Sequence, residues 1–394
     1  MSSDTSSRDT ASTDGFVATL RGVVGTDEFV GLHTPEIGQI DRALVDECLV
    51  STFVSSVGPF VTRFEAEIAE YTGARHAIAV SNGTSALHVA LVLADVRRDD
   101  EVIVPSLSFI ATANAVSHAG AHPVFVDSDA ATLGMSTSAL ADMLSTMAPT
   151  DGGLMNPRTG RRVAAIVPMH TLGHPVDIVG ICAVAARYGV PVVEDAAESL
   201  GSFVGERHTG TFGRLGVLSF NGNKIVTTGG GGIILTDDDA LGALAKSLTT
   251  TAKVPHEWEF EHDAVAWNYR MPNINAALGV AQLTKLEGFV DAKRRLAANY
   301  RAAFADVDGF TFLDEPEGTR SNYWLAAVRI DTDDRADRDR LLRAANDDGV
   351  QCRPLWNLLS EQQMYAECEC GDLSTARALV DSVICLPSSP RLAS

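Results

Sequence analysis

Short runs rich in valine and isoleucine recur between residues 76 and 236, and polar or turn-forming residues flank each of them. Such runs are typical of buried strands. Between most of them apolar residues recur at helical spacing, as over 85–93, 110–118 and 178–188. Strand and helix in alternation predict an α/β fold with a mostly parallel sheet covered on both faces. Seven strands are predicted, at His76–Val80, Glu101–Val104, Pro123–Asp127, Ala164–Pro168, Pro191–Glu194, Gly216–Phe220 and Gly231–Thr236.

The two ends of the chain have different patterns. Residues 1–30 begin with a stretch rich in Ser, Thr and Asp that lacks apolar periodicity, which predicts a disordered tail. A long amphipathic helix is predicted over 284–305, followed by a shorter mixture of strand-like and helix-like segments. We therefore expect a large α/β domain over 31–283, and a linking helix with a small α+β domain over 284–394.

Charge narrows the range of binding partners. The 394 residues include 31 Lys and Arg against 51 Asp and Glu, a formal net charge of -20. Such a field repels nucleic-acid phosphates and anionic lipid surfaces, so we expect neither a nucleic-acid partner nor a membrane partner. The sequence also lacks a long uncharged apolar run and a basic, then apolar, N-terminal signal. A cytoplasmic protein is expected.

The cysteines and histidines do not predict a metal site. Among six scattered cysteines, only Cys368 and Cys370 are spaced closely enough to suggest a pair of metal ligands. A structural zinc site needs about four ligands, and two further ones are not evident. His170 and His174 have a spacing used on zinc-binding helices, but Gly173 and Pro175 interrupt any helix there. We expect no metal.

In such sheets ligands bind at the carboxyl ends of the strands. Three of the predicted strands are followed there by residues suited to binding or catalysis. Gly83 and Thr84 open a helix after the first strand, where free backbone amides could hold a phosphate, although a simple N-cap by Thr84 or Ser85 is the alternative. Asp195 ends a buried strand and needs a cationic partner, unless it only caps the next segment.

Lys224 follows the sixth strand, between apolar residues and a run of four glycines. No acid lies near it in the sequence, so the amine is expected to be partly desolvated, a condition that favours a lysine forming a Schiff base. An exposed, solvated lysine is the alternative. A triphosphate-binding loop is disfavoured because the lysine precedes the glycines.

Together these segments resemble the DegT/DnrJ/StrS group of sugar aminotransferases, over about residues 33–392. The resemblance rests on Ser55-Ser56-Val57-Gly58, Asn82 to Leu87, Pro105 to Asn114, Glu194 to Ser199, Ser219 to Lys224 and Asn268 to Met271. It implies the aspartate aminotransferase fold, which is fold type I of the pyridoxal phosphate-dependent enzymes. It also implies an aminotransferase that uses pyridoxal 5'-phosphate, with pyridoxamine 5'-phosphate as the amino carrier.

The resemblance assigns roles to individual residues. It makes Lys224 the Schiff-base lysine and proton shuttle, and Asp195 the partner of the pyridine nitrogen. Phe109 is expected to stack on the cofactor ring and Glu198 to lie near the ring hydroxyl. The phosphate seat is expected to consist of Gly83, Thr84 and Ser219, with Asn268 reaching it from a neighbouring protomer. A homodimer with shared active sites follows from that last assignment.

The resemblance also suggests the substrates. L-glutamate is the expected amino donor, and a nucleotide-linked keto sugar is the acceptor. A narrower likeness, over 170–177, 249–256, 353–356 and 386–389, is to enzymes that aminate UDP-4-keto-6-deoxy-N-acetylglucosamine for surface glycans. The residues expected to contact the sugar nucleotide are Ser55, Ser56, Arg353 and Trp356.

Three other functions compete with this one. A GDP-perosamine-type synthase shares Phe220 to Lys224 and the glycine run. A sugar 3-dehydratase has the same fold and cofactor, but it carries histidine at the position of Lys224. A binding or regulatory protein of the same fold that has lost turnover is the third, and it would need neither Lys224 nor Asp195.

Overall fold

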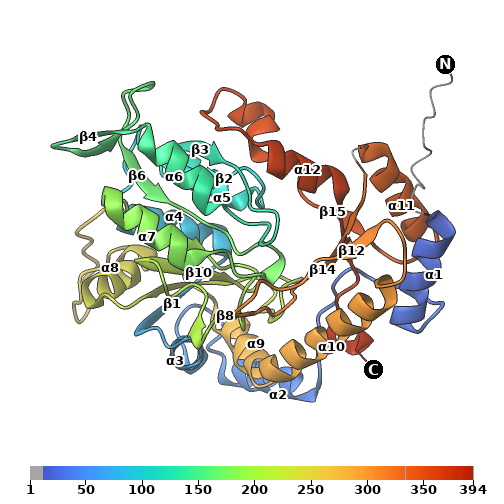
Figure 1. Ribbon diagram of the computed structural model, residues 1–394. Helices are drawn as coiled ribbons and strands as arrows, with labels where there is room; N and C mark the ends of the chain where they lie inside the picture. The colour runs from blue at the N-terminus through green and yellow to red at the C-terminus, as the bar shows by residue number, and fades with distance from the viewer. Residues whose placement is uncertain (1–11, 333, 394) are drawn as a thin grey trace.

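The central sheet contains all seven predicted strands. The computed structural model describes residues 12–332 and 334–393, and Figure 1 shows this sheet between layers of helices. The strands are β1 (His76–Val80), β2 (Glu101–Pro105), β3 (His122–Val126), β6 (Val163–Ile166), β7 (Val193–Asp195), β10 (Leu215–Ser219) and β11 (Gly232–Thr236). They pair in the orders β1-β11-β10-β7 and β3-β2-β6. Parallel bridges, Ile166 to Val192 and Met169 to Asp195, join the two sets between β6 and β7.

Strand direction confirms a mostly parallel sheet. β2 runs parallel to β3 and β6, and β10 runs parallel to β7. β11 is the exception, because it is antiparallel to both β1 and β10. The chain therefore turns back between β10 and β11, and Lys224 lies in that connection.

Helices cover both faces of the sheet because successive strand residues point in opposite directions. Val217 and Ile234 pack on one face with α4 (Gly83–Leu93), whereas Leu218 and Ile233 pack on the other with α3 (Pro59–Thr72). The predicted helices at 85–93, 110–118 and 178–188 are confirmed as α4, α5 (Ala111–His118) and α7 (Ile178–Tyr188). The further helices of this part are α2 (Gln39–Ser51), α6 (Thr137–Ser145), α8 (Asp239–Thr249) and α9 (Asn273–Leu283).

The C-terminal part is built on an antiparallel sheet of order β12-β14-β16-β15. Its elements are β12 (Phe310–Phe312), β14 (Ala326–Ile330), α11 (Arg335–Asp347), β15 (Arg353–Pro354), α12 (Ser374–Ser382) and β16 (Val383–Leu386). The predicted linking helix is α10 (Leu286–Phe304), which packs Phe289 into the core of the large part and Tyr300 into the C-terminal core. The predicted domain boundary at 283/284 falls just before this helix.

Smaller elements complete the described chain. They are the hairpin β4 (Ala148–Thr150) and β5 (Gly153–Met155), the small sheet of β8 (Phe203–Val204), β9 (Arg207–His208) and β13 (Thr319–Arg320), and 3-10 turns at Thr171–Gly173, Leu359–Glu361, Gln363–Tyr365 and Pro390–Leu392. Across the described residues no helix is both long and apolar enough to cross a bilayer.

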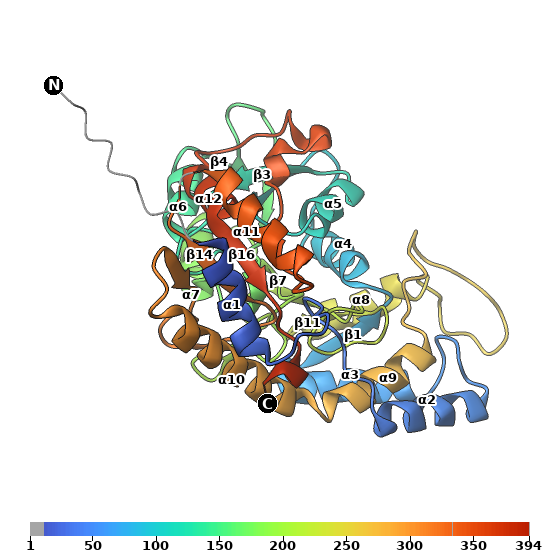
Figure 2. The ribbon, with the colours of Figure 1, turned by 90° about the vertical axis from the view of Figure 1, so that its right-hand side faces the viewer.

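The prediction of a disordered tail over residues 1–30 is wrong for the part of it that the structure describes. Residues 1–11 lie outside the described residues, but α1 (Thr13–Val24) is a regular helix capped by Ser12. Its Phe16 and Leu20 are fully buried, and the Phe16 ring stacks on Phe310 with centroids 5.2 Å apart. Figure 2 shows α1 lying against the C-terminal part. Tertiary packing of these apolar side chains therefore orders a segment whose overall composition is polar.

Removing the Phe16 ring should destabilise the protein. Phe16→Ala leaves a cavity among Phe304, Phe310 and the C-terminal core, which should lower the free energy of unfolding by about 3–5 kcal/mol. Gly22→Ala is the matched control, because Gly22 is exposed in the same helix with open space around it, and it should be neutral or slightly stabilising. Chemical denaturation of the two variants measures this. Equal stabilities would show that α1 does not contribute to the fold.

Candidate active site

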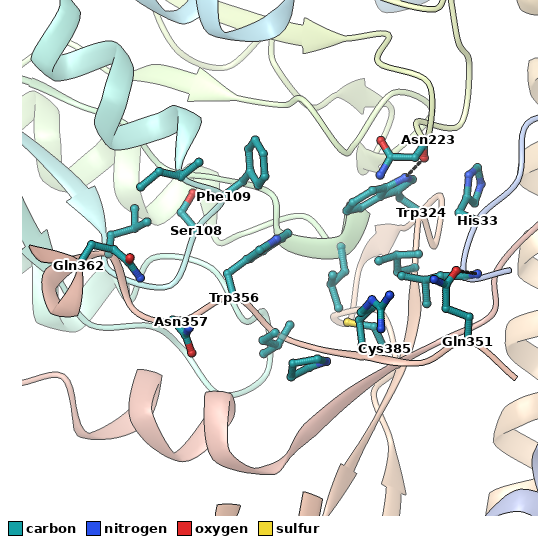
Figure 3. A pocket seen from close by; sticks show the side chains of 18 of the residues that line it. His33, Ser108, Phe109, Asn223, Trp324, Gln351, Trp356, Asn357, Gln362 and Cys385 are labelled. Carbon is teal, nitrogen blue, oxygen red and sulfur yellow. Dashed lines mark hydrogen bonds between the residues drawn. The ribbon is translucent and has the colours of Figure 1, made fainter. Parts of the chain in front are cut away.

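Two cavities meet where the carboxyl ends of β7 and β10 face the N-terminus of α4. The smaller has a volume of about 310 Å³ and the larger about 780 Å³. Four residues line both, and Figure 3 shows them in the larger cavity: Phe109, Asn223, Trp324 and Trp356. Eight of the predicted site residues line the smaller cavity, namely Gly83, Thr84, Phe109, Asp195, Glu198, Ser219, Lys224 and Trp356. A ligand could therefore occupy both spaces at once.

Asp195 contributes a buried carboxylate to the smaller cavity. It ends β7 and is only 2% exposed. Its oxygens accept hydrogen bonds from the Thr112 hydroxyl at 2.7 Å and from the Ala197 amide at 3.2 Å. Burial raises the pKa of Asp195 because it removes water from the charged carboxylate, and the two hydrogen bonds and the Lys224 charge oppose this shift. No cation among the described residues hydrogen-bonds to Asp195. The carboxylate still lacks the cationic partner that the sequence predicts for it.

The preceding carboxylate plays a different part. Glu194 is fully buried, and it accepts hydrogen bonds from the amides of Gly210 and Gly213 and pairs with His170 at 3.0 Å. Its hydrogen-bonding capacity is therefore used within the protein. Of the two adjacent acids, only Asp195 lines the cavity.

Lys224 is paired with an acid that is distant in sequence. Its Nζ lies 3.1 Å from Glu198 Oε1 and 3.9 Å from the centre of the Trp324 ring. The other carboxylate oxygen of Glu198 accepts a hydrogen bond from the Leu172 amide at 3.0 Å. Burial raises the pKa of Glu198 to about 7, with the Lys224 charge opposing that shift. The alternative of an exposed, solvated lysine is therefore wrong.

The N-terminus of α4 offers free backbone amides to the smaller cavity. The alternative that Thr84 or Ser85 caps the helix is wrong, because the Asn82 side chain accepts from the Ser85 amide at 2.8 Å. The amides of Gly83 and Thr84 have no acceptor among the described residues, so they are free to bind an anion. Gly83 also lies close to Ser219, since a Cβ on Gly83 would come within 3.0 Å of Ser219 Cβ.

The larger cavity has aromatic walls and one cation. Phe109 is 48% exposed, and its ring meets Trp356 edge-on at 6.2 Å. Arg353, at the start of β15, lines the same cavity and makes no ion pair with a carboxylate in the described part of the chain. An unpaired arginine beside aromatic side chains suits an anionic ligand that carries a ring.

Three predicted site residues line neither cavity of this chain. Ser55 and Ser56 lie in the turn before α3, where the Ser55 carbonyl accepts from the Asn273 amide. Asn268 is exposed, and its side-chain oxygen accepts from Arg270 Nε at 2.8 Å. A single chain therefore does not bring these three residues to the cavity.

The structure adds residues that sequence reasoning left without a role. Thr112 holds Asp195 and Trp324 covers Lys224. His33 lines the larger cavity, and neither of its ring nitrogens has a hydrogen-bond partner among the described residues. Burial, with help from the Lys293 and Lys224 charges, lowers the pKa of His33. Thr112 lies within Pro105 to Asn114, one of the segments that carry the family resemblance. Trp324 and His33 come from distant parts of the chain that only the fold brings together.

Comparison with known proteins identifies the family. The model of the DegT/DnrJ/EryC1/StrS aminotransferase family matches residues 35–394. The chain belongs to this family. EpsN of Bacillus subtilis (strain 168), which carries the name of a pyridoxal phosphate-dependent aminotransferase, is 35% identical over 92% of this chain and 91% of its own. The GDP-perosamine synthase of Caulobacter vibrioides is 36% identical over 89% of this chain and 90% of its own.

A solved structure agrees with this assignment. The aminotransferase TlmJ from Streptoalloteichus hindustanus superposes with a TM-score of 0.83 at 32% identity, covering 91% of this chain and 93% of its own. The DegT-family protein described here is thus a pyridoxal phosphate-dependent sugar aminotransferase with the type I fold. The fold, the cofactor and the enzyme class expected from the sequence are confirmed.

The residues of the smaller cavity fit the cofactor. A buried carboxylate without a cation suits a protonated pyridine nitrogen, and free amides at a helix start suit a phosphate. Lys224 Nζ lies in the same cavity as both. Within the described residues no group of three or more His, Cys, Asp or Glu side chains could hold a metal ion.

Glu198 should make the stability of the cofactor-free enzyme fall as the pH rises. Its pKa of about 7 in the fold exceeds the ordinary value of 4.5, so folding keeps a proton that the unfolded chain releases between those values. Between about pH 4.5 and pH 7, Glu198→Gln should lose less stability than wild type, the difference reaching about 3 kcal/mol. Denaturation across that range measures it, with the exposed Glu206→Gln as control. Parallel curves for wild type and Glu198→Gln would contradict the burial argument.

Proposed function

We propose that this enzyme moves the amino group of L-glutamate to the 4-keto group of UDP-4-keto-6-deoxy-N-acetylglucosamine. The product is UDP-4-amino-4,6-dideoxy-N-acetylglucosamine for surface glycans. The observation that carries the proposal is that Lys224 and the unpaired carboxylate of Asp195 face one cavity, which opens into a larger one lined by Arg353. The first cavity suits a cofactor and the second suits a sugar nucleotide.

Six residues of the smaller cavity would hold the cofactor. Asp195 would bind the pyridine nitrogen, and the amides of Gly83 and Thr84, with the Ser219 hydroxyl, would bind the phosphate. Phe109 would stack on the ring, and Glu198 would lie near the ring hydroxyl. Pyridoxal phosphate supplies an electron sink at the carbon that carries the amino group.

The chain's own groups then move protons. Lys224 Nζ takes a proton from the amino-bearing carbon of glutamate and returns one to the sugar carbon in the second half-reaction. Glu198, 3.1 Å away, holds Nζ in the cavity between these steps. Donor and acceptor use the same lysine in turn, so ping-pong kinetics are expected.

The nucleotide sugar would lie in the larger cavity. Arg353 is the free cation that a diphosphate requires, and Trp356 with Phe109 offers apolar surfaces to the sugar or base. Leu172, Pro354 and Cys385, from or beside the segments that resemble UDP-sugar enzymes, line this cavity as well. A GDP-linked keto sugar is the second candidate, because a relative 36% identical to this chain is a GDP-perosamine synthase.

The functional unit would be a homodimer. Asn268 lies outside this chain's own cavities, in agreement with a role in the site of a second copy. Ser55 and Ser56 share a surface segment with the exposed Phe53 and Val57, whose apolar side chains are 57% and 66% exposed. Exposed apolar groups of this size favour contact with another chain.

An absorption measurement tests the reaction. Wild type supplied with pyridoxal phosphate should develop a near-visible band from the lysine-bound cofactor, and L-glutamate should remove it. Lys224→Ala should not form this band, and turnover should fall by at least about 10⁴-fold, as expected when a covalent nucleophile is lost. The control Lys246→Ala changes a lysine paired with Glu65 outside both cavities, and it should behave as wild type. Folded wild type that forms no band would overturn the proposal in favour of a binding protein.

The same band identifies the acceptor. After glutamate has removed it, UDP-4-keto-6-deoxy-N-acetylglucosamine should restore it faster than GDP-4-keto-6-deoxymannose does. The reverse order would favour the perosamine-type function over the one proposed.

Mixed dimers test the shared site. Co-expressed Lys224→Ala and Asn268→Ala chains form mixed dimers in which one of the two sites carries both changes and the other carries neither. About a quarter of wild-type activity should return, because about half of the dimers are mixed. The pair Lys224→Ala and Asp195→Ala is the control and should recover nothing, since both residues serve their own chain's cavity. No gain with the Asn268 pair would refute the shared site.

A further inference from the structure

Trp324 contacts both Lys224 and the residue that precedes it. The indole ring lies 3.9 Å from Lys224 Nζ, which is the geometry of a cation–π contact. The indole Nε1 donates a hydrogen bond of 2.7 Å to the carbonyl of Asn223, the residue that precedes Lys224 (Figure 3). One side chain therefore holds both the amino group of the lysine and the backbone from which it extends.

Asn322 closes these contacts into a ring. Its side-chain oxygen accepts from the Trp324 amide at 2.7 Å, and its side-chain nitrogen donates to the carbonyls of Glu198 at 2.8 Å and Leu200 at 2.9 Å. Glu198 in turn accepts from Lys224. The contacts thus run from Lys224 through Glu198, Asn322 and Trp324 back to the backbone beside Lys224.

A buried lysine anchors the tryptophan from behind. Lys293 of α10 is fully buried and donates to the Trp324 carbonyl at 3.1 Å and to the Ser388 carbonyl. Trp324 is 5% exposed and forms part of the wall between the two cavities. The indole is fixed at its backbone, its ring nitrogen and its face.

We propose that Trp324 is a positioning residue that holds the amino group of Lys224 in the cofactor cavity. The inference rests on the proposed role of Lys224 as the cofactor lysine. An electron-rich ring face attracts the protonated amine more than the neutral one, and Trp does so more strongly than Phe. Only the neutral amine condenses with an aldehyde, so Trp324 should raise the pH at which the cofactor is taken up.

Other charges around the lysine stay constant in this comparison. Glu198, Asp195 and His33 are the titratable groups that interact electrostatically with Lys224. None of them is altered by a change at position 324, so their effects are common to wild type and variants. A difference in the pH midpoint of cofactor uptake between wild type and a variant therefore measures the effect of the Trp324 ring.

The test is the rate at which cofactor-free enzyme takes up pyridoxal phosphate, followed by absorption over a series of pH values. Trp324→Leu should move the midpoint of this profile to lower pH by about one pH unit, which is the size expected for a desolvated cation–π contact. Trp324→Phe keeps a ring and should move it by less. Trp258→Leu is the matched control, because Trp258 is 69% exposed and lines neither cavity, and its midpoint should equal that of wild type.

The outcomes separate this inference from the proposed function. Wild type that takes up no cofactor overturns both. Normal uptake by wild type, with folded Trp324→Leu and Trp324→Phe at the wild-type midpoint, overturns the role of Trp324 alone. If Trp324→Leu does not fold, Trp324→Phe decides, since a side chain that acts only by packing would lower thermal stability without moving the midpoint.

Discussion

A buried carboxylate without a cation is the constraint around which this site is built. Asp195 is placed by a central strand, held by Thr112, and surrounded by protein, which makes its charged form costly. The Lys224 charge offsets part of that cost from a distance, but its amine hydrogen-bonds to Glu198 and lies over the Trp324 ring rather than pairing with Asp195. Lys224 is therefore not the hydrogen-bonding partner of Asp195, and a cofactor with a basic ring nitrogen would complete the charge balance.

Backbone geometry keeps Glu198 in place for this arrangement. Leu172 has φ 58, a left-handed conformation that costs a non-glycine residue about 1–3 kcal/mol, and its amide donates to Glu198. Next to it, Gly173 has φ 93, and a Cβ there would overlap the Asn322 side chain that supports Trp324. Local strain and a required glycine occur together where the lysine and its acid meet. The buried contacts on both sides of this turn offset its conformational cost and hold it in place.

The local sequence pattern predicts the strands of the sheet, but it does not predict the ion pairs of the site. The seven strands were predictable because Val and Ile runs alternate with helical spacing, and Lys224 and Asp195 stood out because each follows such a strand. The pairing of Lys224 with Glu198 was not predictable, since the two residues are 26 positions apart with β8, β9 and β10 between them. Helix α1 was missed because Phe16, Leu20 and Val24 are spread through polar sequence and gain their order from the C-terminal core. The cap at Asn82 was missed because the hydroxyls that follow it also suit that position.

The acidity of the chain bears on how it would hold an anionic ligand. A net charge of -20 repels phosphates at long range, but surface charges are screened over about 8 Å at physiological salt. Within that distance, the groups that face the ligand determine whether an anion binds. Arg353 has no carboxylate partner in the described chain despite 51 acidic residues, and the amides of Gly83 and Thr84 are equally free. Each cavity thus has donors or a cation without an acidic partner among the described residues, so an acidic protein can still bind a phosphorylated cofactor and a nucleotide-linked sugar.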